Sequence, residues 1–203
     1  MLPGCVRDGA GRLGHDEKAT KMFTHRIEDG LELRPVDERH AEELTALVRR
    51  DLAHLKKWMP WASERYSVED AREFIRRNLR QAAEDQGFAT LIFFRERLAG
   101  SIGYNNIDWA NRKTDIGYWL AADLQGRGIM TKSCRALVAY AFRELRLNRV
   151  EIFCAVENRR SRRIPERLGF TQEGTHRQAE WVHDHFKDLV AYSMLAREWK
   201  EKQ

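Results

Sequence analysis

The sequence is poor in cysteine and has no long apolar run. Its three cysteines, Cys5, Cys134 and Cys154, are too few and too scattered for a disulfide scaffold, and they lack the paired spacing of a structural zinc site. No apolar run reaches the ~18 residues that a membrane-spanning helix needs. The first 21 residues are rich in glycine and polar side chains, so they do not resemble a secretory signal. These absences predict a protein of a reducing, cytoplasmic compartment that does not contact a membrane.

The composition is that of a folded domain. The 203 residues are 42% hydrophobic and 33% charged, which is enough for one sizeable core. The net charge of +5 indicates attraction to a phosphate-bearing cofactor, an acidic protein or RNA, and a solvated basic surface would explain it equally well. We predict a disordered tail or extension at residues 1–21 and a single domain at residues 22–203, with order beginning near Leu31.

Hydrophobic periodicity predicts an alternation of strands and helices. Asp37 can cap a first helix, and Ser67 with Asp70 forms a capping box for a second one, whose apolar face should carry Ala71, Phe74, Ile75 and Leu79. Strands are predicted at residues 31–34, 87–94, 98–104, 114–120, 149–156, 170–179 and 188–195, and further helices at 131–145 and 161–168. This order predicts an α/β (α+β) fold with a mixed, mostly antiparallel central sheet, helices on its faces, and a parallel pair formed by 114–120 and 149–156.

The most informative segment is a glycine-containing loop between a strand and the long helix. At such a point unpaired backbone N–H groups and the positive end of the helix dipole converge, and glycine lets a ligand approach the backbone. The pattern favours a pyrophosphate site, and a plain turn is the alternative. It matches neither a Walker A motif nor the dinucleotide fingerprint. The loop consists of Gln125, Gly126, Arg127, Gly128, Ile129, Met130 and Thr131.

Three motifs in the same order resemble the GNAT superfamily of N-acetyltransferases. In the loop, Gln125 and Gly128 match the family pattern Gln/Arg-x-x-Gly-x-Gly/Ala, whereas Met130 departs from its small last residue. The loop as a whole looks like that of the Rim-type branch, which acetylates ribosomal-protein N-termini. The other motifs are Asn-Arg-Arg-Ser at 158–161 with the following 164–170, and residues 177–181. The resemblance spans about residues 31–199 and implies a GNAT-like three-layer sandwich.

The resemblance also implies a cofactor site for acetyl-CoA, with no metal. The loop amides of residues 125–131 would hold the pyrophosphate. The strand with Tyr118, Trp119 and Leu120 would hold the pantetheine arm through its backbone, and Asn158 would hydrogen-bond that arm. A backbone N–H near Trp119 and Leu120 would polarise the thioester carbonyl.

The implied reaction is direct attack of a neutral amine on the thioester. Glu180 would be the general base, and Ser161 would protonate or hydrogen-bond the departing thiolate. Ser161 is the candidate because Pro165 stands where many family members have a tyrosine acid. Each residue also has a structural explanation, since Ser161 could cap a helix and Glu180 could belong to a surface ion pair. Cys154 is expected to be a small core residue.

Other chemistry-bearing residues are less specific. Trp58 and Trp61 flank Met-Pro, and the resemblance places this region in the acceptor groove, although both could pack in the core. His183 and His185 flank Asp184, and we expect a solvated turn there because no third metal ligand is evident.

The acceptor is the least determined part of the function. The leading hypothesis is the α-amine of a protein N-terminus, as on a ribosomal protein, with a homodimer as the expected assembly. Acetylation of a small amine (a polyamine, an amino sugar or an antibiotic) is the enzymatic alternative. A non-catalytic acyl-CoA sensor would not need Glu180 and Ser161. Direct nucleic-acid binding is not expected, because no basic-aromatic RNA motif is present.

Overall fold

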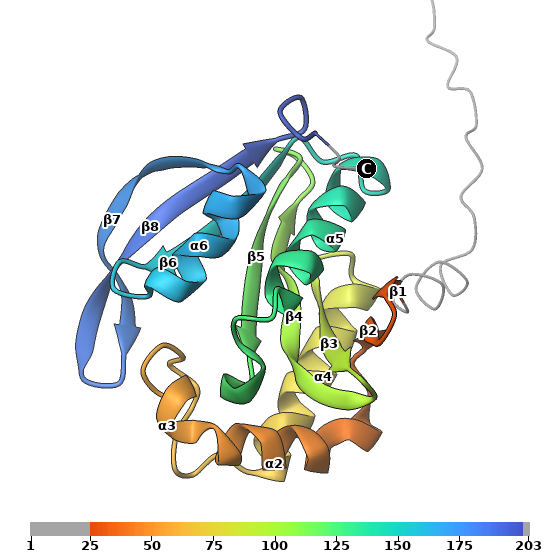
Figure 1. The fold of residues 1–203 in the computed structure, drawn as a ribbon, viewed down its shortest axis with the longest axis vertical. Helices are drawn as coiled ribbons and strands as arrows, with labels where there is room; N and C mark the ends of the chain where they lie inside the picture. Colours follow the sequence, from red (N-terminus) through yellow and green to blue (C-terminus); the bar gives the residue numbers. More distant parts are fainter. Residues whose placement is uncertain (1–24, 201–203) are drawn as a thin grey trace, which may run out of the picture.

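The computed structural model describes residues 25–200, which build one sheet with helices on both faces (Figure 1). The tail predicted at residues 1–21 lies outside the described residues. In chain order the elements are β1 (His25–Glu28), β2 (Leu31–Pro35), the short 3-10 helix η1 (Glu38–His40), α2 (Ala41–Arg50), α3 (Leu52–Leu55), α4 (Val68–Ala83), β3 (Phe88–Phe94), β4 (Arg97–Asp108), β5 (Lys113–Leu120), η2 (Ala122–Leu124), α5 (Ile129–Arg143), β6 (Arg149–Ala155), α6 (Arg159–Leu168), β7 (Thr171–Val182) and β8 (His185–Leu195).

The strands lie in the order β1-β2-β3-β4-β5-β6-β8-β7. Every neighbouring pair is antiparallel except β5 and β6, which are parallel, so the predicted mixed sheet is confirmed. The expectation that order begins near Leu31 is wrong, because β1 pairs with β2 from His25 onward. The side chains of β1 are mostly exposed, so this strand has no alternating apolar pattern that could reveal it.

The two helical layers hold the sheet between them. On β4, the Tyr104 hydroxyl donates to the Leu137 carbonyl of α5 on one face, whereas the Leu98 amide donates to Glu43 of α2. The Ser67–Asp70 capping box opens α4 as predicted. The predicted burial of Leu79 on the apolar face of α4 is wrong, because its side chain is 45% exposed. No helix between residues 25 and 200 is long and apolar enough to cross a bilayer.

The first predicted helix is divided. Asp37 caps the short helix η1 rather than an α-helix, and α2 follows at Ala41. A second break lies at Asp51, whose carboxylate accepts a 2.7 Å hydrogen bond from the Ala122 backbone N–H. The break therefore ties the first helical layer to the segment that leads into the glycine loop.

The parallel strands β5 and β6 pair over a short distance only. Their register runs from Lys113 opposite Arg149 to Asp115 opposite Glu151, and it ends there. Beyond Asp115 the strands diverge, as Figure 1 shows. The rest of β5 keeps its pairing with β4 but has no strand on the β6 side, so its backbone groups on that edge are open to a ligand.

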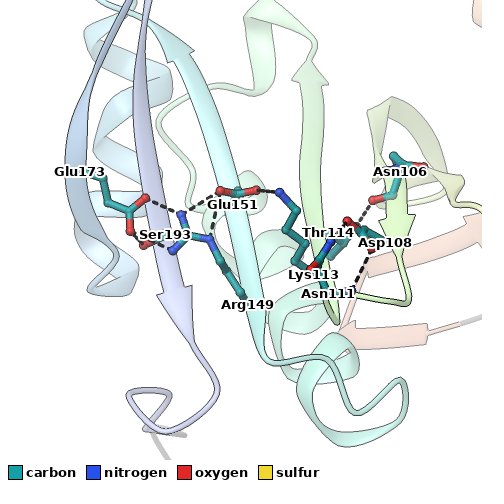
Figure 2. Close-up of polar contacts among 9 residues, drawn as sticks. All are labelled: Asn106, Asp108, Asn111, Lys113, Thr114, Arg149, Glu151, Glu173 and Ser193. Carbon is teal, nitrogen blue, oxygen red and sulfur yellow. Dashed lines mark hydrogen bonds and ion pairs between the residues drawn. The ribbon is translucent and has the colours of Figure 1, made fainter.

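Strands β5 and β6 thus form a wedge that is closed where residues 113–115 pair with residues 149–151 and open beyond them. A network of ion pairs holds the closed end (Figure 2). Arg149 of β6 donates to Glu173 of β7 (Nη1–Oε1, 2.8 Å) and to Glu151 on its own strand (Nη2–Oε1, 2.8 Å). Lys113 of β5 lies 3.8 Å from Glu151, and the Ser193 hydroxyl of β8 donates to Glu173 at 2.7 Å. The guanidinium of Arg149 lowers the pKa of Glu173 to about 2. The strands thus meet firmly at one end and separate at the other.

Replacing Glu173 by glutamine is expected to destabilise the fold by about 1 kcal/mol at neutral pH, a modest value because the carboxylate is 40% exposed and solvent screens the pair. The pKa of Glu173 is depressed from 4.5, so the contribution is present above that value and is lost as the pH falls toward 2. Urea unfolding at a series of pH values checks this. Glu96→Gln, which removes a 77% exposed carboxylate paired with Arg34, is the control. A stability difference that does not shrink in acid would contradict the assignment.

Candidate active site

A cavity of about 850 Å³ opens where β5 and β6 separate. It gathers seven of the predicted site residues from distant parts of the chain, whereas Leu120 and the loop residues 125–131 do not line it. Its walls come from the segment after α3, from α4, from β3 to β6, from the start of α6 and from the β7–β8 hairpin. The predicted site residues that line it are Trp58, Trp61, Tyr118, Trp119, Asn158, Ser161 and Glu180.

Strand β5 presents two different surfaces to the cavity. Tyr118 points toward α6, where its hydroxyl lies 3.2 Å from the Ser161 hydroxyl. Trp119 points to the opposite face, where its ring and that of Trp61 pack edge-to-face with their centroids 5.9 Å apart. Alternation along a strand produces this division. The wedge between β5 and β6 therefore joins the α5–α6 side of the sheet to the side that carries α2–α4.

The glycine loop has the geometry of an anion site. Gly126 and Gly128 have φ values of 77° and 78°, and Gly128 immediately precedes the first residue of α5. A side-chain carbon at Gly126 would meet nothing within 4 Å, and one at Gly128 would meet only Lys132 Cε at 4.0 Å, so the space beside both is open. The first N–H groups of α5 have no acceptor inside the helix and face outward along its axis.

The remaining loop residues divide into main-chain and side-chain contributors. Ile129 and Met130 are only 2% and 6% exposed, so their side chains belong to the core and only their amides reach the loop. This explains why a methionine is tolerated where the family pattern has a small residue. The exposed Arg127 turns back to the Asp123 carbonyl at 3.4 Å.

Gln125 does more than contribute an amide. Its side-chain nitrogen lies 2.7 Å from Nε2 of His54 in α3, and its oxygen accepts from Arg160 of α6 at 2.7 Å. Burial lowers the pKa of His54. The loop is thus connected to both helical layers. Sequence patterns did not reveal His54, because its contact with Gln125 joins segments that are far apart along the chain.

Asn158, and not Ser161, caps α6. Its side-chain oxygen accepts from the Ser161 backbone N–H at 3.1 Å, so the alternative that Ser161 is a helix cap is wrong. The Ser161 hydroxyl instead lies 3.2 Å from the sulfur of Cys154 and donates to Tyr118. Cys154 is buried as expected, and burial raises the pKa of its thiol. The capping oxygen of Asn158 is occupied, which leaves its amide nitrogen for any ligand.

A β-bulge places Glu180. The pairing of β7 with β8 is interrupted between His176 and Glu180, and Gln178 there has a φ of 50°. The backbone N–H of Gln178 donates to the Asp188 carboxylate at 2.7 Å, which fixes the bulge. Pairing resumes with Glu180 opposite Lys187. Bulges commonly redirect a side chain next to a functional site.

The carboxyl group of Glu180 is half-buried on the wall of the cavity. Burial raises its pKa, while the positive charge of Lys187 opposes that shift. Lys187, which lies opposite Glu180, places its ammonium group over the Trp58 ring, and the expected alternative of a surface ion pair of Glu180 is not seen among residues 25–200. A carboxylate with a raised pKa is a better proton acceptor than a fully solvated one.

The two tryptophans take different positions. The side chain of Trp61 is 42% exposed, so the alternative that it packs in the core is wrong. Its ring also lies beside that of Tyr66, with the two centroids 5.6 Å apart. Trp58 is half-buried beneath the ammonium group of Lys187, 5.2 Å from the ring. His183 at the tip of the β7–β8 hairpin meets the Lys56 carbonyl at 3.1 Å. The hairpin and the segment after α3 thus close over one side of the cavity.

His183, Asp184 and His185 lie in or beside the exposed hairpin turn, as expected. Across the part of the chain that the structure describes, no three histidine, cysteine or acidic side chains are grouped as metal ligands. A carboxyl group that sequence patterns did not reveal is Asp115, which accepts from Asn105 at 2.5 Å and lines the cavity. Burial raises its pKa. Its position two residues before Gly117 on the same face of β5 is the signal that could have found it.

A family model described as an acetyltransferase (GNAT) domain matches residues 30–171. The chain belongs to this family. The match includes the glycine loop, the diverging strands and Ser161. The predicted membership and fold class are confirmed.

Two similar proteins with curated names are also acetyltransferases. YdaF of Bacillus subtilis (strain 168), provisionally named a ribosomal N-acetyltransferase, is 41% identical over 180 residues, which cover 88% of this chain and 98% of YdaF. The ribosomal-protein-serine acetyltransferase of Escherichia coli (strain K12) is 32% identical over 174 residues, which cover 85% of this chain and 96% of the relative.

A solved structure matches equally well. RimL, a ribosomal L7/L12 α-N-protein acetyltransferase in complex with coenzyme A, superposes with a TM-score of 0.80 at 32% identity, covering 84% of this chain and 96% of RimL. The GNAT chain described here is therefore an N-acetyltransferase that uses acetyl-CoA. Its open loop glycines, the free start of α5 and the unpaired edge of β5 fit a ligand with a pyrophosphate and an extended arm.

Proposed function

We propose that this GNAT acetyltransferase transfers the acetyl group to the α-amine of a protein N-terminus, as on a ribosomal protein. The observation that carries the proposal is the cavity through the wedge, which has Ser161 on the α6 side and a half-buried, unpaired Glu180 at the hairpin. The names of the relatives support a protein acceptor. An N-terminal amine is a suitable nucleophile because its pKa of about 7.7–8.0 leaves part of it neutral at physiological pH.

The donor side is assigned to three elements. The amides of residues 125–131 would bind the pyrophosphate, and the free edge of β5 at Tyr118, Trp119 and Leu120 would pair with the pantetheine arm. Asn158 would add its amide nitrogen. Acetyl-CoA supplies a thioester, and a backbone N–H near Trp119 and Leu120 would polarise its carbonyl.

On the acceptor side, Glu180 would take the proton that the amine loses. The amine nitrogen bonds to the thioester carbon as the carbon–sulfur bond breaks, and the sulfur leaves as a thiolate that Ser161 hydrogen-bonds. Cys154 supports direct transfer, because a buried thiol with a raised pKa is a poor nucleophile. A sensor without catalysis would not need a carboxyl group with a raised pKa in the cavity.

The acceptor wall is formed by Trp61 and the neighbouring segment. Its aromatic surface suits a peptide chain, since tryptophan supplies rigid apolar area together with a hydrogen-bond donor. A small amine remains the alternative. A homodimer and a cytoplasmic location also stay predictions, and the ring pair of Trp181 and Phe186, 52% and 55% exposed, supports a protein-contact surface on the β7–β8 hairpin.

The acceptor class is tested by initial rates. A peptide with a free N-terminal serine or alanine is expected to exceed a polyamine and an amino sugar in kcat/KM by at least about tenfold, which corresponds to ~1.4 kcal/mol. Trp61→Ala should raise the KM for the peptide about tenfold without changing the affinity for acetyl-CoA. Trp109→Ala, which removes a similarly exposed ring outside the cavity, is the control. Equal or faster turnover of the polyamine would overturn the proposal.

A further inference from the structure

The phenol of Tyr118 makes a set of polar contacts that pantetheine binding through the backbone of β5 does not explain. It accepts a 3.2 Å hydrogen bond from the Ser161 hydroxyl and donates one, also 3.2 Å, to the Ser161 carbonyl. The sulfur of Cys154 lies 3.8 Å away. The phenol therefore contacts both the hydroxyl and the backbone carbonyl of Ser161, at the point where β5 and β6 have separated.

Pro165 explains why the Ser161 carbonyl is available. In an α-helix this carbonyl would accept from the backbone N–H four residues later, and that residue is Pro165, inside α6. Proline has no N–H, and its ring crowds the carbonyl four residues earlier. The Tyr118 hydroxyl supplies the missing donor from a strand 43 residues away. Tyr118 and Pro165 together thus fix the first turns of α6 against β5.

We propose that Tyr118 is the positioning residue that directs the Ser161 hydroxyl at the departing sulfur. The inference rests on the proposed role of Ser161 and deepens it. A serine hydroxyl has one hydrogen and several rotamers, so alone it would point to whichever acceptor is nearest. With Tyr118 in place, the oxygen is held between the phenol and the thiol of Cys154, 3.2 Å from each.

During the reaction the hydroxyl groups of Ser161 and Tyr118 each exchange one hydrogen-bond acceptor for another. As negative charge develops on the sulfur, the Ser161 hydrogen turns from Tyr118 to the sulfur, and the Tyr118 hydrogen turns from the Ser161 carbonyl to the Ser161 oxygen. The serine then donates to the thiolate while it accepts from the phenol, and linked bonds of this kind strengthen one another. No covalent bond of Tyr118 changes. The amine proton goes to Glu180, and the thiolate takes a proton from solvent after release.

A double-mutant cycle on the single-turnover rate tests this coupling. Tyr118→Phe is expected to lower the rate about tenfold, the effect of one hydrogen bond, with the KM for acetyl-CoA nearly unchanged. Ser161→Ala should lower it at least as much, and the double variant should be no slower than Ser161→Ala alone. Tyr140→Phe removes a half-buried phenol of α5 outside the cavity and should have no effect. Additive losses would overturn the inference, as would a Tyr118→Phe variant that changes only the KM for acetyl-CoA.

A second variant tests the part played by the proline. Pro165→Ala restores an N–H that can bond the Ser161 carbonyl and so frees the Tyr118 hydrogen for the Ser161 oxygen. It should therefore speed single turnover when Tyr118 is present and have no such effect in the Tyr118→Phe background. An equal effect in both backgrounds, or a loss when Tyr118 is present, would count against the inference. All rates are measured with a peptide and with a small amine, because the leaving group is common to both. If the non-additive losses are seen with the small amine and the peptide is not acetylated, the role of Tyr118 is supported and the proposed protein acceptor is wrong.

Discussion

Replacing Glu180 by glutamine is expected to lower kcat by about 10²–10⁴-fold while acetyl-CoA binding survives. Glutamine keeps the shape of the side chain but cannot accept a proton from the attacking amine. Steady-state rates and calorimetric titration of acetyl-CoA measure the two effects separately. Asp184→Asn, which neutralises an exposed carboxylate at the tip of the same hairpin, is the matched control and should change neither. An unchanged rate would remove Glu180 from the mechanism.

The pH profile provides an independent check on the same residue. Burial raises the pKa of Glu180 above 4.5, and a base acts only when it is deprotonated, so activity should rise as the pH passes that raised value. Lys187 opposes the shift, and Lys187→Gln should therefore move the acid limb to higher pH. A limb that moves to lower pH in this variant would contradict the assignment.

Replacing Gly128 by valine is expected to weaken acetyl-CoA binding at least about tenfold, or ~1.4 kcal/mol. The φ of 78° at this residue is strained for a β-branched side chain, which would also stand in the open space at the start of α5. Calorimetric titration measures the affinity, and thermal unfolding confirms that the variant folds.

Gly128→Asn separates the two causes, because asparagine tolerates a positive φ but still adds a side chain. We expect it to fold like the parent protein and to bind acetyl-CoA more weakly. Retention of tight binding by both variants would show that the pyrophosphate lies elsewhere.

The parts of the fold that sequence predicts are those governed by local periodicity. The β3–β4 hairpin, the long helix after the glycine loop and the Ser67–Asp70 capping box follow from neighbouring residues alone. The edge strand β1 could not be found this way, because it pairs with β2 while its side chains stay mostly exposed. Leu79 has a helical spacing that fits the buried face, yet Asn78 takes the buried position and bonds to the Phe74 carbonyl.

The candidate site likewise has features that follow from neighbouring residues and features that depend on tertiary packing. The glycine loop is predictable because a strand, two glycines and a helix start are consecutive. The choice between Asn158 and Ser161 as the cap of α6 is not, since both residue types cap helices and they lie three residues apart. The contacts between Tyr118 and Ser161 and between Gln125 and His54 depend on the packing of separate elements, so no local pattern encodes them.

Direct transfer to an α-amine is the central claim, and intact-mass analysis after limited turnover tests it most directly. The enzyme is mixed with acetyl-CoA, first alone and then with a ribosomal-protein acceptor that has a free N-terminal serine or alanine and internal lysines. We predict no acetyl group on the enzyme in the first mixture, and a single acetyl group on the α-nitrogen of the acceptor in the second. An acetyl group on Cys154, or acetylation of acceptor lysines with the N-terminus left free, would contradict the claim.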